Sequence, residues 1–107
     1  MSITINIFYT GENDNATRFM QEMEECGIAD KIRKESGNLR YEYYVPVNDK
    51  HTILLIDSWE NEEALAFHHA SPMMKEISEL REKYDLHMRV EQYTKVETNE
   101  EDEFIRK

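Results

Sequence analysis

The residues best suited to chemistry lie in one short stretch near the middle of the chain, from Trp59 to Pro72. His68 follows Ala64 by four residues and Leu65 by three, so in a helix its ring shares their inward side. Histidine titrates near neutral pH and can act as a general base. The spacing therefore predicts that His68 meets Trp59 beneath two helices, at the wall of a small ligand pocket. A hydrogen-bonded structural histidine is the alternative.

The elements that must position these residues follow from hydrophobic periodicity. Alternating apolar residues predict strands over residues 3–10, 39–45, 52–59 and 86–93. Helical spacing predicts either one kinked helix or two short ones between Asn15 and Gly37, with an interruption at Gly27. Asn61 is expected to cap a third helical segment and Ser71 a fourth. The order β-α-β-β-α-β predicts an α+β fold of the ferredoxin-like, split βαβ type, with helices on one face of an antiparallel four-stranded sheet.

The second face of this sheet predicts self-association. The central strands are apolar on both faces, and no predicted element is left to cover the side opposite the helices. Two such sheets could stack against each other, which predicts a homodimer. Residues 1–96 form the predicted domain, and 97–107 form an acidic tail in which Phe104 and Ile105 could dock on a partner subunit.

Composition and charge exclude several classes of function. The chain has 13 Lys and Arg against 23 Asp and Glu and a formal net charge of -10, which disfavours nucleic acid and an anionic membrane surface as partners. Cys26 is a lone cysteine, so an internal disulfide is ruled out. The first residues lack the pattern of a signal peptide, and no apolar run could span a bilayer, so a cytoplasmic location is expected.

Several segments resemble the antibiotic biosynthesis monooxygenase domain family over roughly residues 2 to 94. They are Gly37 to Tyr41, Trp59-Glu60, Ala64-Leu65, His68 and Ser71-Pro72. The resemblance implies a dimeric α/β barrel of ferredoxin-like subunits, often a cofactor-free oxygenase of quinols or polycyclic phenols. The quinol monooxygenase branch is similar in the spacing of its Trp, His and Ser/Thr-Pro residues. The isomerase of phosphorylated autoinducer-2 is also similar, in residues 37–40 and 66–68.

The haem-degrading branch of the family fits less well. Its members use an Asn on the first strand, a Trp in the short helix and an iron-ligating His one helix further on. Asn6 stands at the first position, but His68 and Ser78 stand at the other two. His68 and His69 are adjacent and diverge, so no metal site and no cofactor are expected.

These observations give a hypothesis for the site. A cofactor-free oxygenase must deprotonate its substrate, hold the anion and exclude water while dioxygen reacts. His68 would be the base, with Asn6 and a tyrosine as donors to the anion. The residues expected to bind the substrate are Trp59, Tyr41, Tyr43, Phe67, Met73, Met74 and Arg40. The function predicted is the oxidation of a small quinol or phenol by dioxygen. The alternatives are an isomerase of a small phosphorylated sugar-like signal, for which Arg40 and Lys50 make a thin clamp, and a non-catalytic ligand-binding dimer.

Overall fold

A single antiparallel sheet of four strands forms the base of the fold in the computed structural model, which describes residues 1–96 and 105–106. The strand order is β2-β3-β1-β4. The central strands β1 and β3 pair along their whole length, from Ile3 opposite Trp59 to Thr10 opposite Thr52. The strands are β1 (Ile3–Thr10), β2 (Asn38–Tyr44), β3 (Thr52–Trp59) and β4 (His87–Thr94). The four predicted strands are confirmed to within one residue at each end.

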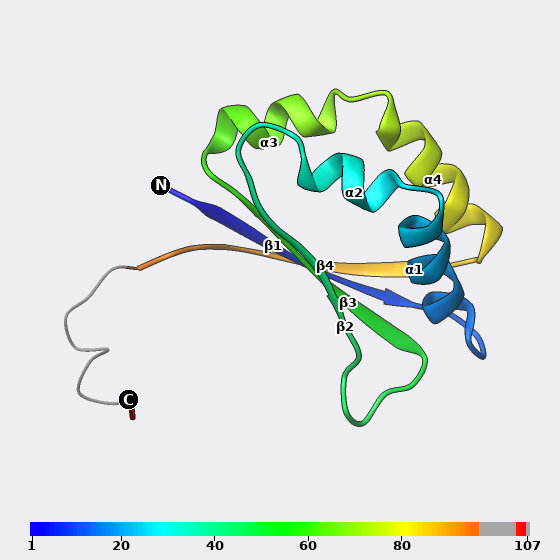
Figure 1. Cartoon of the computed structure of the whole chain (residues 1–107). Helices are drawn as coiled ribbons and strands as arrows, with labels where there is room; N and C mark the ends of the chain where they lie inside the picture. The colour runs from blue at the N-terminus through cyan, green and yellow to red at the C-terminus, as the bar shows by residue number, and fades with distance from the viewer. Residues whose placement is uncertain (97–104, 107) are drawn as a thin grey trace.

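All four helices lie on the same face of the sheet (Figure 1). They are α1 (Asn15–Glu25), α2 (Ile28–Arg33), α3 (Glu62–His69) and α4 (Met73–Lys83). Gly27 has a φ of 86°, a left-handed conformation that glycine adopts without steric cost, so α1 and α2 are two short helices rather than one kinked helix. No helix among the described residues has both the length and the apolar character needed to cross a bilayer. The predicted ferredoxin-like α+β architecture is confirmed.

The helix starts are fixed partly by local caps and partly by tertiary contacts. Oδ1 of Asn61 accepts a hydrogen bond from the Ala64 amide at 2.9 Å, as expected for the cap of α3. Oγ of Ser71 accepts from the Met73 amide at 3.2 Å at the start of α4. At α1, by contrast, Asp14 makes no side-chain cap, and Nδ2 of Asn15 donates to the Tyr84 carbonyl at 3.2 Å. That bond joins α1 to the end of α4.

The core lies between the central strands and the helices. The largest fully buried side chains are Trp59, Phe19, Met23, Ile32, Ile53 and Leu55. Strand β4 is at the edge of the sheet and is largely exposed. A hollow therefore remains on the helix side, between β4 and helices α3 and α4.

The opposite face of the sheet has no helix over it (Figure 1). We call this surface the open face; because strand residues alternate, it carries Asn6 and Phe8 from β1 and Leu54 and Ile56 from β3. At the β2 edge, Arg40 binds Tyr44 and Glu42. The open face is thus apolar at its centre and charged toward its edges. The predicted docking of Phe104 and Ile105 falls mostly outside the described residues.

Candidate functional site

A cavity of about 250 Å³ fills the hollow between the sheet and helices α3 and α4. Seven apolar side chains line it, and seven polar side chains converge on it from β1, β2, β3, β4, α3 and α4. The apolar lining residues are Ile5, Ile7, Leu55, Met74, Ile77, Met88 and Val90. The polar lining residues are Tyr9, Tyr41, Asp57, His68, His69, Arg81 and Gln92. A concave hollow with apolar walls and converging polar groups is typical of small-molecule sites, and its volume lies just below their usual range of about 300–1,000 Å³.

His68 is held from two sides. Its Nδ1 lies 2.7 Å from Oε1 of Glu35, and both side chains are almost fully buried. Its ring stacks on Trp59, with ring centroids 4.6 Å apart and an interplanar angle of 27°. The predicted meeting of His68 and Trp59 beneath the helices is therefore confirmed. A ring fixed in this way cannot rotate freely, so its orientation toward the cavity is set by the fold.

The contact with Glu35 also determines which ring nitrogen can do chemistry. A carboxylate can only accept, so Nδ1 of His68 carries the hydrogen and donates it to Glu35. The neutral ring then has its lone pair on Nε2, which has no hydrogen bond to any residue in 1–96. A carboxylate that orients a histidine and stabilises its protonated form is the arrangement of a general base.

Asp57 is an acidic group that lines the cavity itself, whereas Glu35 contacts His68 without lining the cavity. It is 3% exposed, and its Oδ1 has no hydrogen-bond partner among residues 1–96 and 105–106. Burial raises the pKa of the Asp57 carboxyl to about 7, and the charge of Glu35 adds to the rise. The indole N–H of Trp59 is near enough to oppose this rise in pKa, but it makes no well-aligned hydrogen bond. Asp57 therefore titrates near neutral pH.

Two tyrosines supply neutral hydroxyl groups to the cavity. Burial raises the pKa of Tyr9 to about 12 and the pKa of Tyr41 well above its ordinary value of 10.0. The hydroxyl of Tyr43 donates to that of Tyr41 at 3.4 Å, so Tyr41 keeps its own hydrogen for a ligand. Both lining tyrosines stay protonated through the physiological range and can donate a hydrogen bond to an anion.

Arg81 brings a positive charge to the cavity from α4. Its Nη1 donates to the Met88 sulfur, a weak acceptor, at 2.8 Å. Within residues 1–96 no carboxylate lies within 4.0 Å of its guanidinium, in contrast to Arg33, Arg40 and Arg89, which all form ion pairs. The positive charge of Arg81 lowers the pKa of Tyr9, although burial has the larger, opposite effect.

Some of the residues predicted for the site meet in the structure. His68, Tyr41 and Met74 line the cavity. Trp59 is fully buried behind His68, and Tyr43 stands behind Tyr41, so both support the wall rather than form it. Met73 packs against the core without lining the cavity.

Three predicted residues lie elsewhere. Asn6 is on the open face beside Phe8, so the sheet separates it from His68, and Arg40 shares that face. The hypothesis that Asn6 and Arg40 join His68 in one site within one chain is therefore wrong. Phe67 is 69% exposed and borders a different hollow beside Gly37, because adjacent residues on a helix point about 100° apart. His69, expected to be only exposed, is exposed but also borders the cavity.

Two carboxylates of the site were not predicted: Asp57 lines the cavity, and Glu35 binds His68 without lining the cavity. Glu35 carries no sequence signal, because it reaches His68 only through the approach of α3 to the turn before β2. Asp57 does carry one, because it lies two residues before Trp59 and two after Leu55 on the inward side of an otherwise apolar strand. A charge at such a position indicates a functional group.

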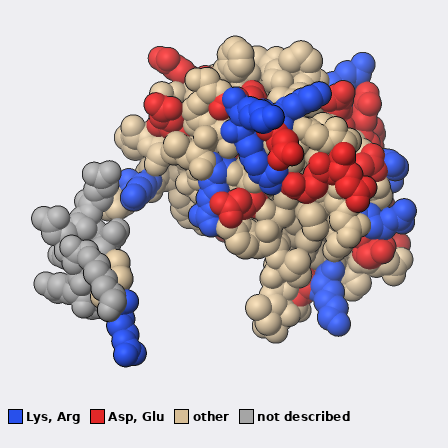
Figure 2. Space-filling model, viewed as in Figure 1, with Lys and Arg blue, Asp and Glu red and all other residues tan. Residues whose placement is uncertain are grey.

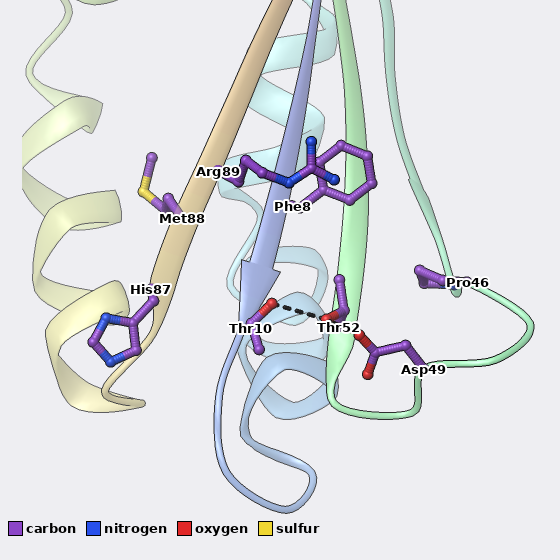
Figure 3. A pocket seen from close by; sticks show the side chains of 8 residues that line it. All are labelled: Phe8, Thr10, Pro46, Asp49, Thr52, His87, Met88 and Arg89. Carbon is purple, nitrogen blue, oxygen red and sulfur yellow. Dashed lines mark hydrogen bonds between the residues drawn. The ribbon is translucent and has the colours of Figure 1, made fainter.

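A larger and shallower hollow of about 480 Å³ lies on the open face (Figure 3). There Arg89 stacks on the Phe8 ring at 3.9 Å, and the hydroxyls of Thr10 and Thr52 are 2.8 Å apart. Oγ1 of Thr52 also donates to Asp49 at 2.7 Å. These polar groups satisfy one another, so this hollow is a weaker candidate for chemistry than the more enclosed cavity at His68.

Positive and negative side chains are interspersed over the helices (Figure 2).

Among the described residues, no group of three or more His, Cys, Asp or Glu side chains is arranged to hold a metal ion. Ser78, at the position of the iron ligand in the haem-degrading branch, is exposed and does not line the cavity at His68.

Comparisons with known proteins agree with this fold. The family model described as antibiotic biosynthesis monooxygenase matches residues 2–80. A candidate antibiotic biosynthesis monooxygenase from Deinococcus radiodurans is similar, with a TM-score of 0.76 and 20% identity over 92% of this chain and 95% of that one. SnoaB, a cofactor-independent oxygenase from Streptomyces nogalater, gives a TM-score of 0.74 and 12% identity over 92% and 96%. A conserved protein from Methanosarcina mazei gives a TM-score of 0.77 and 21% identity over 90% of this chain and 94% of that one. At these identities the likeness to solved structures shows the fold alone. A search of curated proteins gives no match.

Proposed function

We propose that this chain, which belongs to the antibiotic biosynthesis monooxygenase family, is a cofactor-independent monooxygenase of a small quinol or phenol-like aromatic. The observation that carries the proposal is the pairing of His68 with Glu35 at the wall of an apolar cavity. A cavity of about 250 Å³ favours a single aromatic ring over a polycyclic substrate.

The chemistry needs no external reductant, because the substrate supplies the electrons. Nε2 of His68 takes the proton of one hydroxyl, and Glu35 stabilises the imidazolium that forms. The anion then reduces dioxygen by one electron, and the resulting radical pair combines to form a C–O bond. Cleavage of the O–O bond releases water, so that a hydroquinone and dioxygen give a hydroxyquinone and water. The apolar walls exclude solvent while the pair reacts.

The protein side of the mechanism also needs donors to the anion. The protonated hydroxyls of Tyr9 and Tyr41 line the cavity and can serve in this role. One tyrosine donor is expected from the sequence, and the second takes the role expected of Asn6.

The proposal includes a homodimer formed by stacking of two open faces. Phe8, Leu54 and Ile56 place an apolar centre on this face, and charged residues surround it, which is the usual anatomy of an interface. The cytoplasmic location predicted from the sequence belongs to the same proposal.

The test is oxygen uptake with a panel of substituted hydroquinones, together with mass spectrometry of the product after incubation under ¹⁸O₂. The informative variant is His68→Asn, because its amide can still donate to Glu35 from near the position of Nδ1 but provides no base at Nε2. We expect uptake to fall by at least about 100-fold, the contribution of a positioned general base. Thermal unfolding checks that the variant folds.

The matched control is His51→Gln, since His51 lies in the loop before β3, away from the cavity. Uptake equal to buffer over the whole panel, or His68→Asn with the activity of the native protein, would overturn the proposal. Uptake without ¹⁸O in the product would instead indicate simple oxidation of the quinol.

A further inference from the structure

Asp57 is a buried carboxyl group to which the proposed proton transfer assigns no role. It lies two residues before the end of β3, one of the two central strands, is 3% exposed and has one oxygen with no hydrogen-bond partner among the described residues. Burying an ionisable group without a partner costs several kcal/mol. A buried carboxyl that the fold leaves unsatisfied, on the wall of a cavity, is expected to find its partner in a ligand.

Asp57 and His68 are neighbours in the cavity. Trp59 follows Asp57 by two residues on the same face of β3, and its ring stacks on His68. Both Asp57 and His68 line the cavity, and the apolar side chains of Ile5 and Leu55 lie along the same wall. An aromatic ring in this space can therefore present one polar edge to His68 and another to Asp57.

We propose that Asp57 binds a second hydroxyl group of the ligand, so that the cavity selects diphenols over monophenols. The identification of that ligand as the substrate rests on the monooxygenase function proposed above. One hydroxyl donates to Nε2 of His68, and the other donates to the carboxylate of Asp57, which lines the cavity.

The selectivity follows from the burial of Asp57. A monophenol of the same size would cover the carboxylate without giving it a hydrogen bond, so an unpaired charge would lose its remaining water. Sites built to bond a hydroxyl reject analogues that lack it far more strongly than apolar sites reject a change in size. We therefore expect a preference of at least about 10-fold.

The experiment compares binding of hydroquinone with binding of 4-methoxyphenol, which has the same ring but lacks the second hydroxyl hydrogen. Titrations are anaerobic, so no turnover occurs. Trp59 is the single tryptophan of the chain and is stacked on His68, so its fluorescence reports on occupation of the cavity. Calorimetry provides an independent dissociation constant for each ligand.

The test variant is Asp57→Asn, and the control is Asp85→Asn at an exposed aspartate beyond α4. Asparagine can donate to the methoxy oxygen, which a carboxylate cannot do. We expect the preference for hydroquinone to fall to about threefold or less in Asp57→Asn, within the range of one neutral hydrogen bond, and to be unchanged in Asp85→Asn. An unchanged preference in Asp57→Asn, or no preference in the native protein, overturns the proposal.

The pH dependence of the native protein tests the same point without a variant. The groups that face Asp57 from the elements around it are Tyr9, Tyr41, Trp59, Glu35, His68, His69 and Arg81. Burial raises the pKa of Asp57 to about 7, so the population of its acid form increases as the pH falls from 8 to 6. The acid form can donate to the methoxy oxygen, so the preference for hydroquinone should decrease over this range. Both ligands donate one hydroxyl to Nε2 of His68 in the same way, so the ratio of the two dissociation constants isolates Asp57. A ratio that is constant over this range counts against the proposal.

The outcome also separates this inference from the proposed function. Selective binding of hydroquinone that depends on Asp57, without any oxygen uptake, supports the Asp57 site and refutes the monooxygenase. Oxygen uptake that depends on His68, with equal binding of hydroquinone and 4-methoxyphenol, supports the monooxygenase and refutes the Asp57 site.

Discussion

Nδ1 of His68 lies 2.7 Å from Oε1 of Glu35, although the two residues are 33 positions apart in the chain. Glu35 is in the turn between α2 and β2, and His68 is in the last turn of α3. Their contact joins the α2–β2 turn to helix α3 at the wall of the cavity. The ring is thereby held in one tautomer, with Nε2 as the nitrogen available to a ligand.

This contact predicts the behaviour of Glu35→Gln. Glutamine keeps the size and can accept from Nδ1, but it lacks the charge that stabilises the imidazolium. Oxygen uptake should fall by at least about 10-fold while binding of hydroquinone changes little. The matched control is Glu79→Gln on the exposed side of α4. Uptake in Glu35→Gln equal to that of the control would show that Glu35 has no role in proton transfer.

Asp57 predicts an unusual dependence of stability on pH. Burial raises its pKa to about 7, above the value near 3.9 of an unfolded chain, so the folded state binds more protons between these values. The contribution of Asp57 to the free energy of unfolding therefore falls as the pH rises from about 4 to 7, and its full cost, at most about 4 kcal/mol, is present above pH 7. Asp57→Asn removes this cost.

The corresponding measurement is urea unfolding of both proteins at several pH values. The variant should gain stability relative to the native protein as the pH rises from 5 to 8, and the gain should level off above pH 8. A difference independent of pH would mean that Asp57 titrates at its ordinary value.

A side chain at Gly37, just before the start of β2, is expected to be strongly destabilising. Its φ is 85°, and an added Cβ would lie 2.5 Å from the Cβ of Ala64 in α3. Its carbonyl also accepts a hydrogen bond from the Glu60 amide at 2.8 Å, so the backbone is held on both sides. Gly37→Ala should cost roughly 3 kcal/mol or more, from left-handed strain together with the clash.

Gly27 provides the matched control, because its φ is 86° but an added Cβ meets nothing within 4 Å. Gly27→Ala should cost only about 1–2 kcal/mol, the strain alone. Chemical unfolding of the two variants measures the difference. Equal losses would show that α3 can move away from Gly37 without cost.

The open face predicts the effect of charge on association. Ile56→Lys places an ammonium at its apolar centre, where a stacked second subunit would bury it unpaired. The dissociation constant of the dimer should increase by at least about 100-fold, as measured by sedimentation velocity. Phe67→Lys changes an exposed apolar residue on the helix side and should leave the dimer intact. A dimer that survives Ile56→Lys would need an interface elsewhere.

The sequence by itself determined the elements and most of the fold. The alternation of Ile3, Ile5 and Ile7, the capping residue Asn61 and the break at Gly27 act through neighbours in the chain, so their consequences are visible in a single sequence. The inward direction of His68 and its approach to Trp59 followed in the same way, because both lie in one continuous strand-turn-helix segment.

Only the tertiary structure decided the composition of the site. Strand register put Asn6 and Arg40 on the open face and Asp57 on the helix side, and the packing of α3 against the turn before β2 brought Glu35 to His68. Period-two alternation separates the two faces of a strand but does not say which face the helices cover. A contact between residues 33 positions apart depends on how the elements pack, and that information is spread over the whole core rather than held by Glu35 and His68.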